Sequence, residues 1–371
     1  MKCGSLSRVA CALAMAGLIA FMALPAQAKS TSKEKSVEST VSADANEQPV
    51  LQSTTGLVAD ADSGQIYYEK GMHTRMFPAS ITKILTALVS VEKGSPSDVV
   101  TVPQDVVQAQ GKSVANIALV PGDTITLEQL EYTMFLASAN DSAVVIADHI
   151  GGSVSGFVDM MNEKAAALGA TDSHFSTPNG LPDPNNYTTA YDMALIARAA
   201  AQNPTVMRYF GARTFTLPAS ALRKNAQTFT TLHKMMKKTA YYDADVVAGK
   251  TGWETMSGNT LVTIAKKNGR TLVAVVMNGV NSEAIYGDTQ HLLNYAFAQP
   301  ANPAAEKLAF AQSKTADIDV PLAAKPVQKP HTSSADGGLM PEVLAVTCLG
   351  LLICTLVALV CWRVRRRGFL E

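Results

Sequence analysis

The chain has 371 residues, of which 47% are hydrophobic, and its formal net charge is zero at pH 7. This length allows one large domain or two ordinary ones, and the balanced charge argues against nucleic acid as a partner. All five cysteines lie in the two apolar ends of the chain, which excludes disulfides, a thiolate nucleophile and a cysteine zinc site from the region between them.

The first 28 residues have the pattern of a secretory signal peptide. Two basic residues precede an apolar run from 9 to 24, and the small residues Ala26 and Ala28 follow it. This pattern predicts export with cleavage after Ala28, and the alternative is an uncleaved N-terminal anchor. Residues 29–53 are rich in Ser, Thr, Lys and Glu, so we expect a flexible leader.

A β-hairpin and a buried helix are expected next. Residues 56–60 and 65–69 resemble strands and flank a short Asp-Ser-Gly turn. Residues 77–83 (Phe-Pro-Ala-Ser-Ile-Thr-Lys) then open a run with apolar residues at helical spacing. We therefore expect Ser80 in the first helical turn with Lys83 beside it. The Ser-x-x-Lys spacing occurs four times, but only here does it head an apolar helical run.

The rest of the folded region reads as a helical block followed by strands. Between residue 95 and about residue 210, helices are expected at 127–135, 144–150, 157–168 and 189–201. Strands are expected at 214–217, 246–253, 259–266 and 271–280, and a last helix at 282–297. This order predicts an α+β fold with an antiparallel sheet, flanking helices and an inserted helical subdomain.

The C-terminal part reads as a tether and a membrane anchor. Residues 299–342 contain several prolines and are expected to link the folded domain, residues 54–298, to the membrane. Residues 343–362 form an uncharged apolar run long enough to span a bilayer. Four arginines follow it in residues 363–371, which predicts a single-pass protein with a cytoplasmic tail and an extracytoplasmic domain.

Three short polar motifs follow one another along the folded region. The first heads the buried helix, the second interrupts the helical block, and the third lies on a strand. They are Ser80-x-x-Lys83, Ser138-x-Asn140 and Lys250-Thr251-Gly252. Each motif alone is weak evidence, but in this order they form the signature of penicillin-binding proteins and class A β-lactamases.

The first two motifs fit acyl transfer through a serine. Ser80 is the candidate nucleophile that forms an acyl-enzyme, and Lys83 is the candidate general base. Burial and the nearby cation Lys250 would both lower the pKa of Lys83. Ser138 is the candidate proton relay, and Asn140 is expected to orient Lys83 and the substrate.

The third motif is expected to bind substrate. Lys250 offers a cation and Thr251 a hydroxyl to a substrate carboxylate, and Gly252 leaves room for a ligand to approach the backbone. The backbone N–H groups of Trp253 and Ser80 would form the oxyanion hole, as directed donors require.

The region from residue 55 to 297 resembles a serine-type D-alanyl-D-alanine carboxypeptidase, a low-molecular-mass penicillin-binding protein. Beyond the three motifs, the similarity includes Pro121-Gly122-Asp123, Asn179-Gly180-Leu181 and residues 189–194. The resemblance implies a β-lactamase/DD-peptidase-like fold, no cofactor and no metal. It also implies removal of the terminal D-alanine from peptidoglycan stem peptides ending in D-Ala-D-Ala, which regulates cross-linking, and acylation by β-lactams.

Two positions depart from the family pattern. Trp253-Glu254 follows the third motif where many relatives have Tyr-Thr or His-Thr, and strand alternation from Thr251 and Trp253 predicts that Glu254 points outward. Ile285 stands where some relatives carry an arginine that helps to bind the terminal carboxylate, so we assign no such residue.

Other functions remain open. A transpeptidase or endopeptidase uses the same residues, and a non-catalytic penicillin-binding receptor could keep them. A class A β-lactamase needs a further glutamate, and Glu163, expected on an exposed helix face, is the only one between Ser138 and Lys250. The six histidines lack metal-type spacing, which disfavours a metallo-carboxypeptidase.

Overall fold

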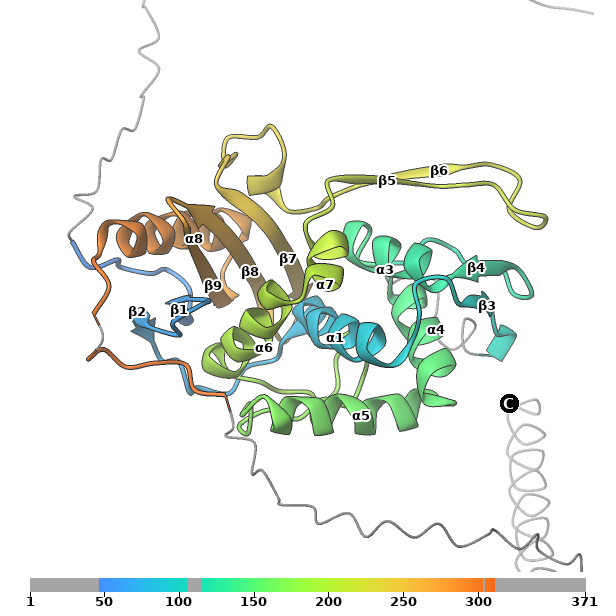
Figure 1. Ribbon diagram of the computed structural model, residues 1–371, viewed down its shortest axis with the longest axis horizontal. Helices are drawn as coiled ribbons and strands as arrows, with labels where there is room; N and C mark the ends of the chain where they lie inside the picture. Colours follow the sequence, from blue (N-terminus) through green and yellow to red (C-terminus); the bar gives the residue numbers. More distant parts are fainter. Residues whose placement is uncertain (1–46, 106–114, 303, 311–371) are drawn as a thin grey trace, which may run out of the picture. The chain divides into compact units, whose positions relative to one another are not determined.

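The structure, a computed structural model, describes residues 47–105, 115–302 and 304–310. At its centre lies a five-stranded antiparallel sheet with the strand order β2-β1-β9-β8-β7 (Figure 1). Its strands are β1 (Thr55–Asp60), β2 (Ile66–Lys70), β7 (Val246–Glu254), β8 (Gly258–Lys267) and β9 (Arg270–Gly279). The predicted hairpin of residues 56–60 and 65–69 is confirmed, because β1 pairs with β2; β8 also pairs with β9, and β7 lies at the edge.

Helices flank the sheet and form a second, helical region beside it (Figure 1). They are η1 (Ala79–Thr82), α1 (Lys83–Lys93), α3 (Leu127–Leu136), α4 (Asn140–Gly151), α5 (Val154–Ala167), α6 (Ala190–Gln202), α7 (Pro204–Phe210) and α8 (Ser282–Ala298). Thr126 caps α3, since its hydroxyl accepts from Gln129 N while the Gln129 side chain accepts from Thr126 N.

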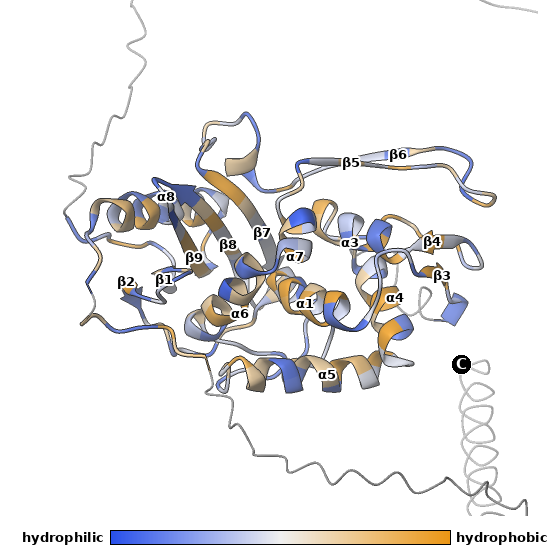
Figure 2. Ribbon diagram, in the orientation of Figure 1, coloured by the Kyte–Doolittle hydropathy of each residue, from blue (hydrophilic) through white to orange (hydrophobic). Residues whose placement is uncertain are grey.

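Alternate residues of the strands fill the two faces of the sheet. Val58 and Val276 lie in the hydrophobic cluster that includes α8, whereas Leu57 and Val275 lie in the cluster that includes α1 and α6. Since successive side chains of a strand point to opposite faces, one sheet can serve two cores. Figure 2 shows the hydrophobic residues along these strands and along α1.

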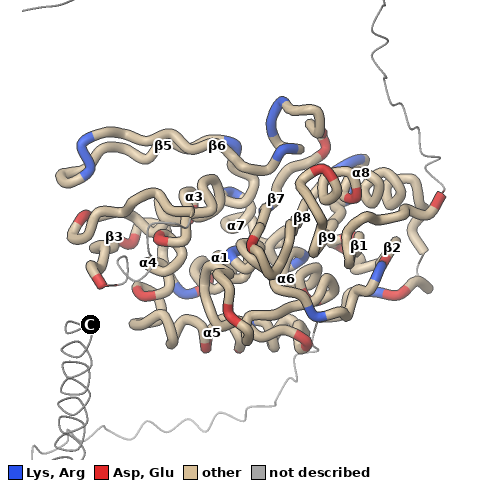
Figure 3. The backbone as a smooth tube through the Cα atoms, turned by 180° about the vertical axis from the view of Figure 1, so that it is seen from behind, with Lys and Arg blue, Asp and Glu red and all other residues tan. Residues whose placement is uncertain are grey.

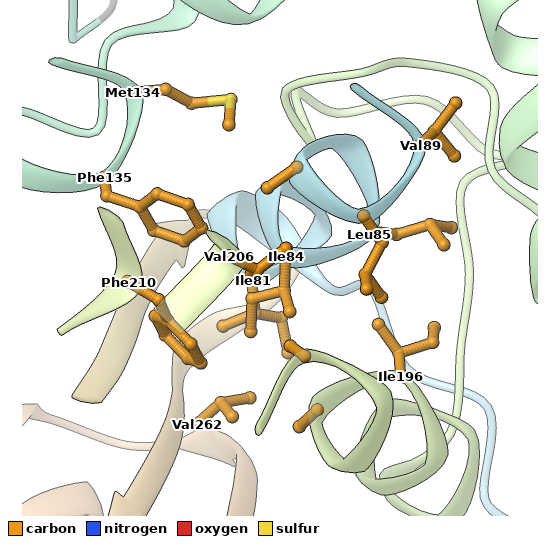
Figure 4. Close-up of a cluster of buried hydrophobic side chains, with 14 of the residues drawn as sticks. Ile81, Ile84, Leu85, Val89, Met134, Phe135, Ile196, Val206, Phe210 and Val262 are labelled. Atoms are coloured by element: carbon orange, nitrogen blue, oxygen red, sulfur yellow. The ribbon is translucent and has the colours of Figure 1, made fainter. Parts of the chain in front are cut away.

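Helix α1 is the centre of the larger core, and this fixes the position of its first turn. Ile81, Ile84 and Leu85 are fully buried, and Figure 4 shows them among side chains of other helices and of the sheet, such as Phe135 and Val262. Full burial of side chains of this size contributes about 1.5–3 kcal/mol each. The core therefore holds the segment that carries Ser80 and Lys83.

Several short elements lie outside the main sheet, and of these only the strand at 214–217 was predicted. Two small antiparallel pairs lie there, and a 3-10 turn precedes β7. They are β3 (Val99–Thr101) with β4 (Thr124–Thr126), β5 (Thr214–Leu217) with β6 (Gln227–Thr230), and η2 (Lys234–Met236). The predicted strand at 214–217 is confirmed as β5. The other segments, of three or four residues, carry too little periodicity to be recognised.

The folded domain extends beyond both of its predicted boundaries. Lys70 Nζ donates hydrogen bonds of 2.9 and 2.8 Å to the carbonyl oxygens of Leu51 and Ser53, and Leu51 is buried. At the other end, the backbone of Lys307 forms an isolated antiparallel β-bridge with that of Gln65. Parts of the predicted leader and tether therefore pack on the domain, one through buried Leu51 and the other through the contact of Lys307 with Gln65.

The predicted membrane-directed segments lie outside the described residues. This holds for the signal peptide (1–28), the transmembrane helix (343–362) and the tail (363–371). Within 47–105, 115–302 and 304–310, no helix is long and apolar enough to cross a bilayer.

Glu131 of α3 is a buried acid in the helical region, beside Ser90 and a small cavity. Burial raises the pKa of its carboxyl group from 4.5 to about 8. The folded protein therefore keeps a proton that the unfolded chain releases, so the contribution of Glu131 to stability is full below pH 4.5 and is lost as pH rises toward 8. We expect Glu131→Gln to remove this fall, which is at most about 5 kcal/mol at about 1.4 kcal/mol per pKa unit.

Urea unfolding of the parent and of Glu131→Gln at pH 5 and pH 8 measures this effect. Glu163→Gln, on an exposed position of α5, is the matched control and should follow the parent. Parallel pH dependence of the parent and Glu131→Gln would show that the folded protein does not hold this proton.

Candidate active site

Ser80 lies on the η1 turn that leads directly into α1. Ala79 before it has a φ of 51°, a left-handed conformation that costs energy for a residue with a side chain. Two glycines let other segments approach this turn closely. A Cβ atom at Gly252 would lie 2.9 Å from Ser80 N, and one at Gly180 would lie 1.9 Å from Ala79 O. Among backbone atoms, the one nearest to a Cβ at Gly252 is thus Ser80 N, in the η1 turn.

Lys83 is fully buried one turn after Ser80, and its Nζ has three oxygen neighbours. They are Ser80 Oγ at 2.9 Å, Asn140 Oδ1 at 2.7 Å and the Asn179 carbonyl oxygen at 2.8 Å. Burial, and then the nearby cation Lys250, hold the pKa of Lys83 well below its usual value of 10.5.

This geometry suits a neutral amine that accepts a proton from Ser80. A neutral lysine has two N–H donors and one lone pair. Asn140 Oδ1 and the Asn179 carbonyl accept the two donors, so the lone pair is left facing the Ser80 hydroxyl. A proton can therefore pass from Ser80 Oγ to Lys83 Nζ over a normal hydrogen-bond distance.

The break between α3 and α4 places the second motif. Ser138 has a φ of 54°, and α4 begins two residues later, at Asn140. Asp141, the next residue, accepts hydrogen bonds from the backbone N–H groups of Ile117 and Leu119. These bonds tie the start of α4 to a neighbouring segment and hold the preceding turn.

The third motif lies on the edge strand β7. Lys250 Nζ donates hydrogen bonds of 2.9 Å to Ser138 Oγ and 2.8 Å to the Thr251 carbonyl oxygen. Burial lowers the pKa of Lys250 from 10.5 to about 7. The described residues thus form two groups, Ser80 with Lys83 and Asn140, and Ser138 with Lys250.

The two groups meet at a cleft of about 560 Å³. Six of the predicted site residues line it: Ser80, Ser138, Asn140, Thr251, Gly252 and Trp253. The two lysines of the motifs lie behind this wall, since Lys83 is 0% and Lys250 2% exposed. Trp253 is 62% exposed and stands at the rim.

The predicted outward orientation of Glu254 is wrong. Glu254 lines the same cleft as Thr251 and Trp253, and its carboxylate acts on the pKa of Lys83, which it raises. Because β7 is an edge strand, the cleft runs along its edge and side chains from both of its faces reach it. Burial raises the pKa of Glu254 itself.

We expect Glu254→Gln to shift the pH dependence of acylation to lower pH. The negative charge of Glu254 raises the pKa of Lys83, so its removal lets Lys83 lose its proton at lower pH. Acylation rates measured across a pH series test this, with Glu163→Gln as the control that keeps the parent profile. An unchanged profile in Glu254→Gln would mean that this carboxylate does not act on Lys83.

Sequence reasoning missed other residues at the cleft. The Asn179 carbonyl binds Lys83, but a backbone group has no sequence signature, and residues 179–181 were noted only as part of a resemblance. Lys234 and Ser282 also line the cleft, from η2 and the start of α8. Ile285 is buried in its wall and adds no charge there.

The sequence of the chain is similar to those of known enzymes. A family model described as D-alanyl-D-alanine carboxypeptidase (peptidase S11) matches residues 42–281. The chain is 29% identical to the D-alanyl-D-alanine carboxypeptidase DacF of Bacillus subtilis over 253 residues, 67% of this chain and 63% of DacF. It is 33% identical to DacB2 of Mycobacterium tuberculosis, another D-alanyl-D-alanine carboxypeptidase, over 62% of this chain and 76% of that protein. The chain therefore covers less than two thirds of DacF.

Solved structures share the fold. A crystal structure of a D-alanyl-D-alanine carboxypeptidase from Mycobacterium tuberculosis matches with a TM-score of 0.63 and 30% identity, over 71% of this chain and 97% of that one. A mutant of a Streptomyces DD-transpeptidase matches with a TM-score of 0.64 and 25% identity, over 68% of this chain and all of that one. The predicted α+β, DD-peptidase-like fold is confirmed. The family model, these relatives and the arrangement of the three motifs lead to one conclusion: the chain belongs to the D-alanyl-D-alanine carboxypeptidase family.

Proposed function

We propose that the chain is a serine D-alanyl-D-alanine carboxypeptidase that removes the terminal D-alanine from peptidoglycan stem peptides. The observation that carries this proposal is the contact of 2.9 Å between Ser80 Oγ and the buried Lys83 Nζ at the wall of the cleft. A serine beside a lysine whose pKa is held well below its usual value can pass its proton to that lysine and attack an amide.

In the first step, Ser80 Oγ attacks the carbonyl carbon of the penultimate D-alanine while its proton moves to Lys83. The C–N bond then breaks, the leaving amine takes a proton, and free D-alanine departs from an ester-linked acyl-enzyme. Ser138 lies in the same cleft, with its Oγ 2.9 Å from Lys250 Nζ, and passes this proton to the leaving amine.

In the second step, water gives a proton to Lys83 as it attacks the ester carbonyl, the bond between the carbonyl carbon and the Ser80 oxygen breaks, and that oxygen takes the proton from Lys83 as the shortened peptide is released. The backbone N–H groups of Ser80 and Trp253 hold the negative oxygen in both steps. The close approach of Gly252 to Ser80 N supports this role, because it brings the backbone of β7 beside that of the nucleophile.

The setting of the enzyme follows from its substrate. Peptidoglycan lies outside the cytoplasm, and the N-terminal signal sequence together with the apolar run at 343–362 and its following arginines fit an exported, single-pass membrane protein. A β-lactam presents a strained amide and a carboxylate to the same groups, so it should acylate Ser80.

The test follows release of D-alanine from a peptide ending in D-Ala-D-Ala, with the full chain in mild detergent. A matched peptide ending in L-Ala-L-Ala is the control. Release from the first peptide alone supports the carboxypeptidase. Penicillin acylation without D-alanine release would favour a receptor or a transpeptidase that lacks its acceptor, and rapid penicillin hydrolysis would favour a β-lactamase.

A further inference from the structure

The cleft contains a cation that neither the motifs nor the proposed mechanism uses. Among the described residues that line the cleft, Lys234 is the only lysine or arginine. It lies on η2, in the connection between β6 and β7, where Figure 3 shows several basic residues. Its side chain is 35% exposed, so the ammonium group can reach a bound molecule.

Lys250, the cation expected to bind a substrate carboxylate, is poorly placed for this. Its side chain is 2% exposed, and its Nζ already donates to Ser138 Oγ and to the Thr251 carbonyl oxygen. Burial also lowers its pKa to about 7. The contacts of Lys250 with Ser138 and Thr251 thus lie inside the wall.

Lys234 is held in place by groups from two elements. Its Nζ donates a hydrogen bond of 2.7 Å to Ser282 Oγ, and it lies 5.5 Å from the ring centres of both Tyr241 and Tyr286. Its backbone N–H also donates to Tyr286 Oη at 2.9 Å. The rings limit the positions that the ammonium can take, while their faces favour a positive charge.

The structure already places a carboxylate beside this cation. Glu283 Oε1 lies 3.8 Å from Lys234 Nζ, but the Glu283 side chain is 66% exposed and is free to turn into solvent. Ser282 accepts from Lys234, so its own O–H remains able to donate to an anion. Lys234 and Ser282 thus offer two adjacent donors on the cleft wall.

We propose that Lys234 and Ser282, with the Thr251 hydroxyl, bind the terminal carboxylate of the substrate, and that Lys234 supplies the positive charge that selects for it. This inference rests on the proposed function, because it names the carboxylate subsite of the same cleft. The same subsite would take the carboxylate of a β-lactam.

The test compares ligands that differ only in this carboxylate, with the full chain in mild detergent. The first pair is a diacetyl-L-Lys-D-Ala-D-Ala peptide and its C-terminal amide, measured by D-alanine or D-alaninamide release. The second pair is benzylpenicillin and its methyl ester, measured by the acylation rate. Lys234→Met should lower kcat/KM for the carboxylate member roughly 10- to 100-fold, as expected for a charged hydrogen bond, and leave the other member nearly unchanged.

Two further variants sharpen the result. Lys234→Arg keeps the cation and should keep most of the preference for a carboxylate. Lys238→Met removes an exposed lysine from the same connection and should leave the preference unchanged. An equal loss for both members of each pair in Lys234→Met, or an unchanged preference, would overturn the inference, as would a Lys234→Arg variant that is as unselective as Lys234→Met.

The experiment distinguishes failure of the proposed carboxypeptidase function from failure of the inference about Lys234. If the parent releases no D-alanine but benzylpenicillin acylates it, the carboxypeptidase activity is refuted. The penicillin and its ester would then still report whether Lys234 selects the carboxylate.

Discussion

Ser80→Ala is expected to abolish acylation, with a loss of about 10⁴-fold or more, because it removes the hydroxyl that faces Lys83 Nζ. Lys83 Nζ approaches Ser80 Oγ at 2.9 Å, and Ala at this position removes the attacking atom while the turn stays intact. The acylation rate with benzylpenicillin and the release of D-alanine should both fall. Thermal unfolding should stay close to that of the parent, since Ser80 is only half-buried.

Ser90→Ala is the matched control, because Ser90 and Lys93 repeat the Ser-x-x-Lys spacing on the same helix. Ser90 is buried away from the cleft, so its variant should be acylated at the parent rate. Acylation retained in Ser80→Ala would contradict the assignment of the nucleophile.

Lys83→Met is expected to lower the acylation rate by about 10³-fold or more. Losses of this size are typical when an enzyme loses a general base that also orients the nucleophile. Methionine keeps most of the length of the side chain but lacks the amine that accepts a proton. Lys83→Arg tests the same point differently, because it keeps a positive charge that is never released. Both variants should be inactive if Lys83 acts as a base, whereas an active Lys83→Arg would assign it a purely electrostatic role.

The pH dependence gives an independent test of Lys83. Burial and Lys250 lower the pKa of Lys83, so the neutral amine is present below the usual range of a lysine. The parent acylation rate should therefore rise as pH increases through this lowered pKa and level off below pH 10.5. Lys93→Met, at an exposed position of α1, is the control and should keep both the rate and the profile.

Local patterns were enough to predict the elements that carry the motifs. Helical spacing placed Ser80 and Lys83 at the head of a buried helix, and the interrupted pattern at Ser138 marked the turn before α4. Alternation and turn residues likewise predicted the hairpin of β1 and β2 and the later strands β7, β8 and β9. In each case the prediction depends on one short segment, in which the spacing of the apolar residues indicates which side is buried.

What the sequence missed depends on contacts between distant segments. Asn179 reaches Lys83 through a carbonyl group across 96 residues of chain. Lys234 enters the cleft because Ser282 and two tyrosines hold it there, and no motif marks it. Glu254 was misplaced because alternation distinguishes the faces of a strand but not the sides of a cleft that runs along the strand edge.

The central claim is that Ser80 forms the acyl-enzyme, and mass spectrometry tests it most directly. The full chain would be incubated with benzylpenicillin, digested, and each modified peptide sequenced. The account predicts one lasting penicilloyl group, attached to Ser80 and absent from Ser80→Ala. A penicilloyl group on any other residue, or an unmodified chain, would contradict it.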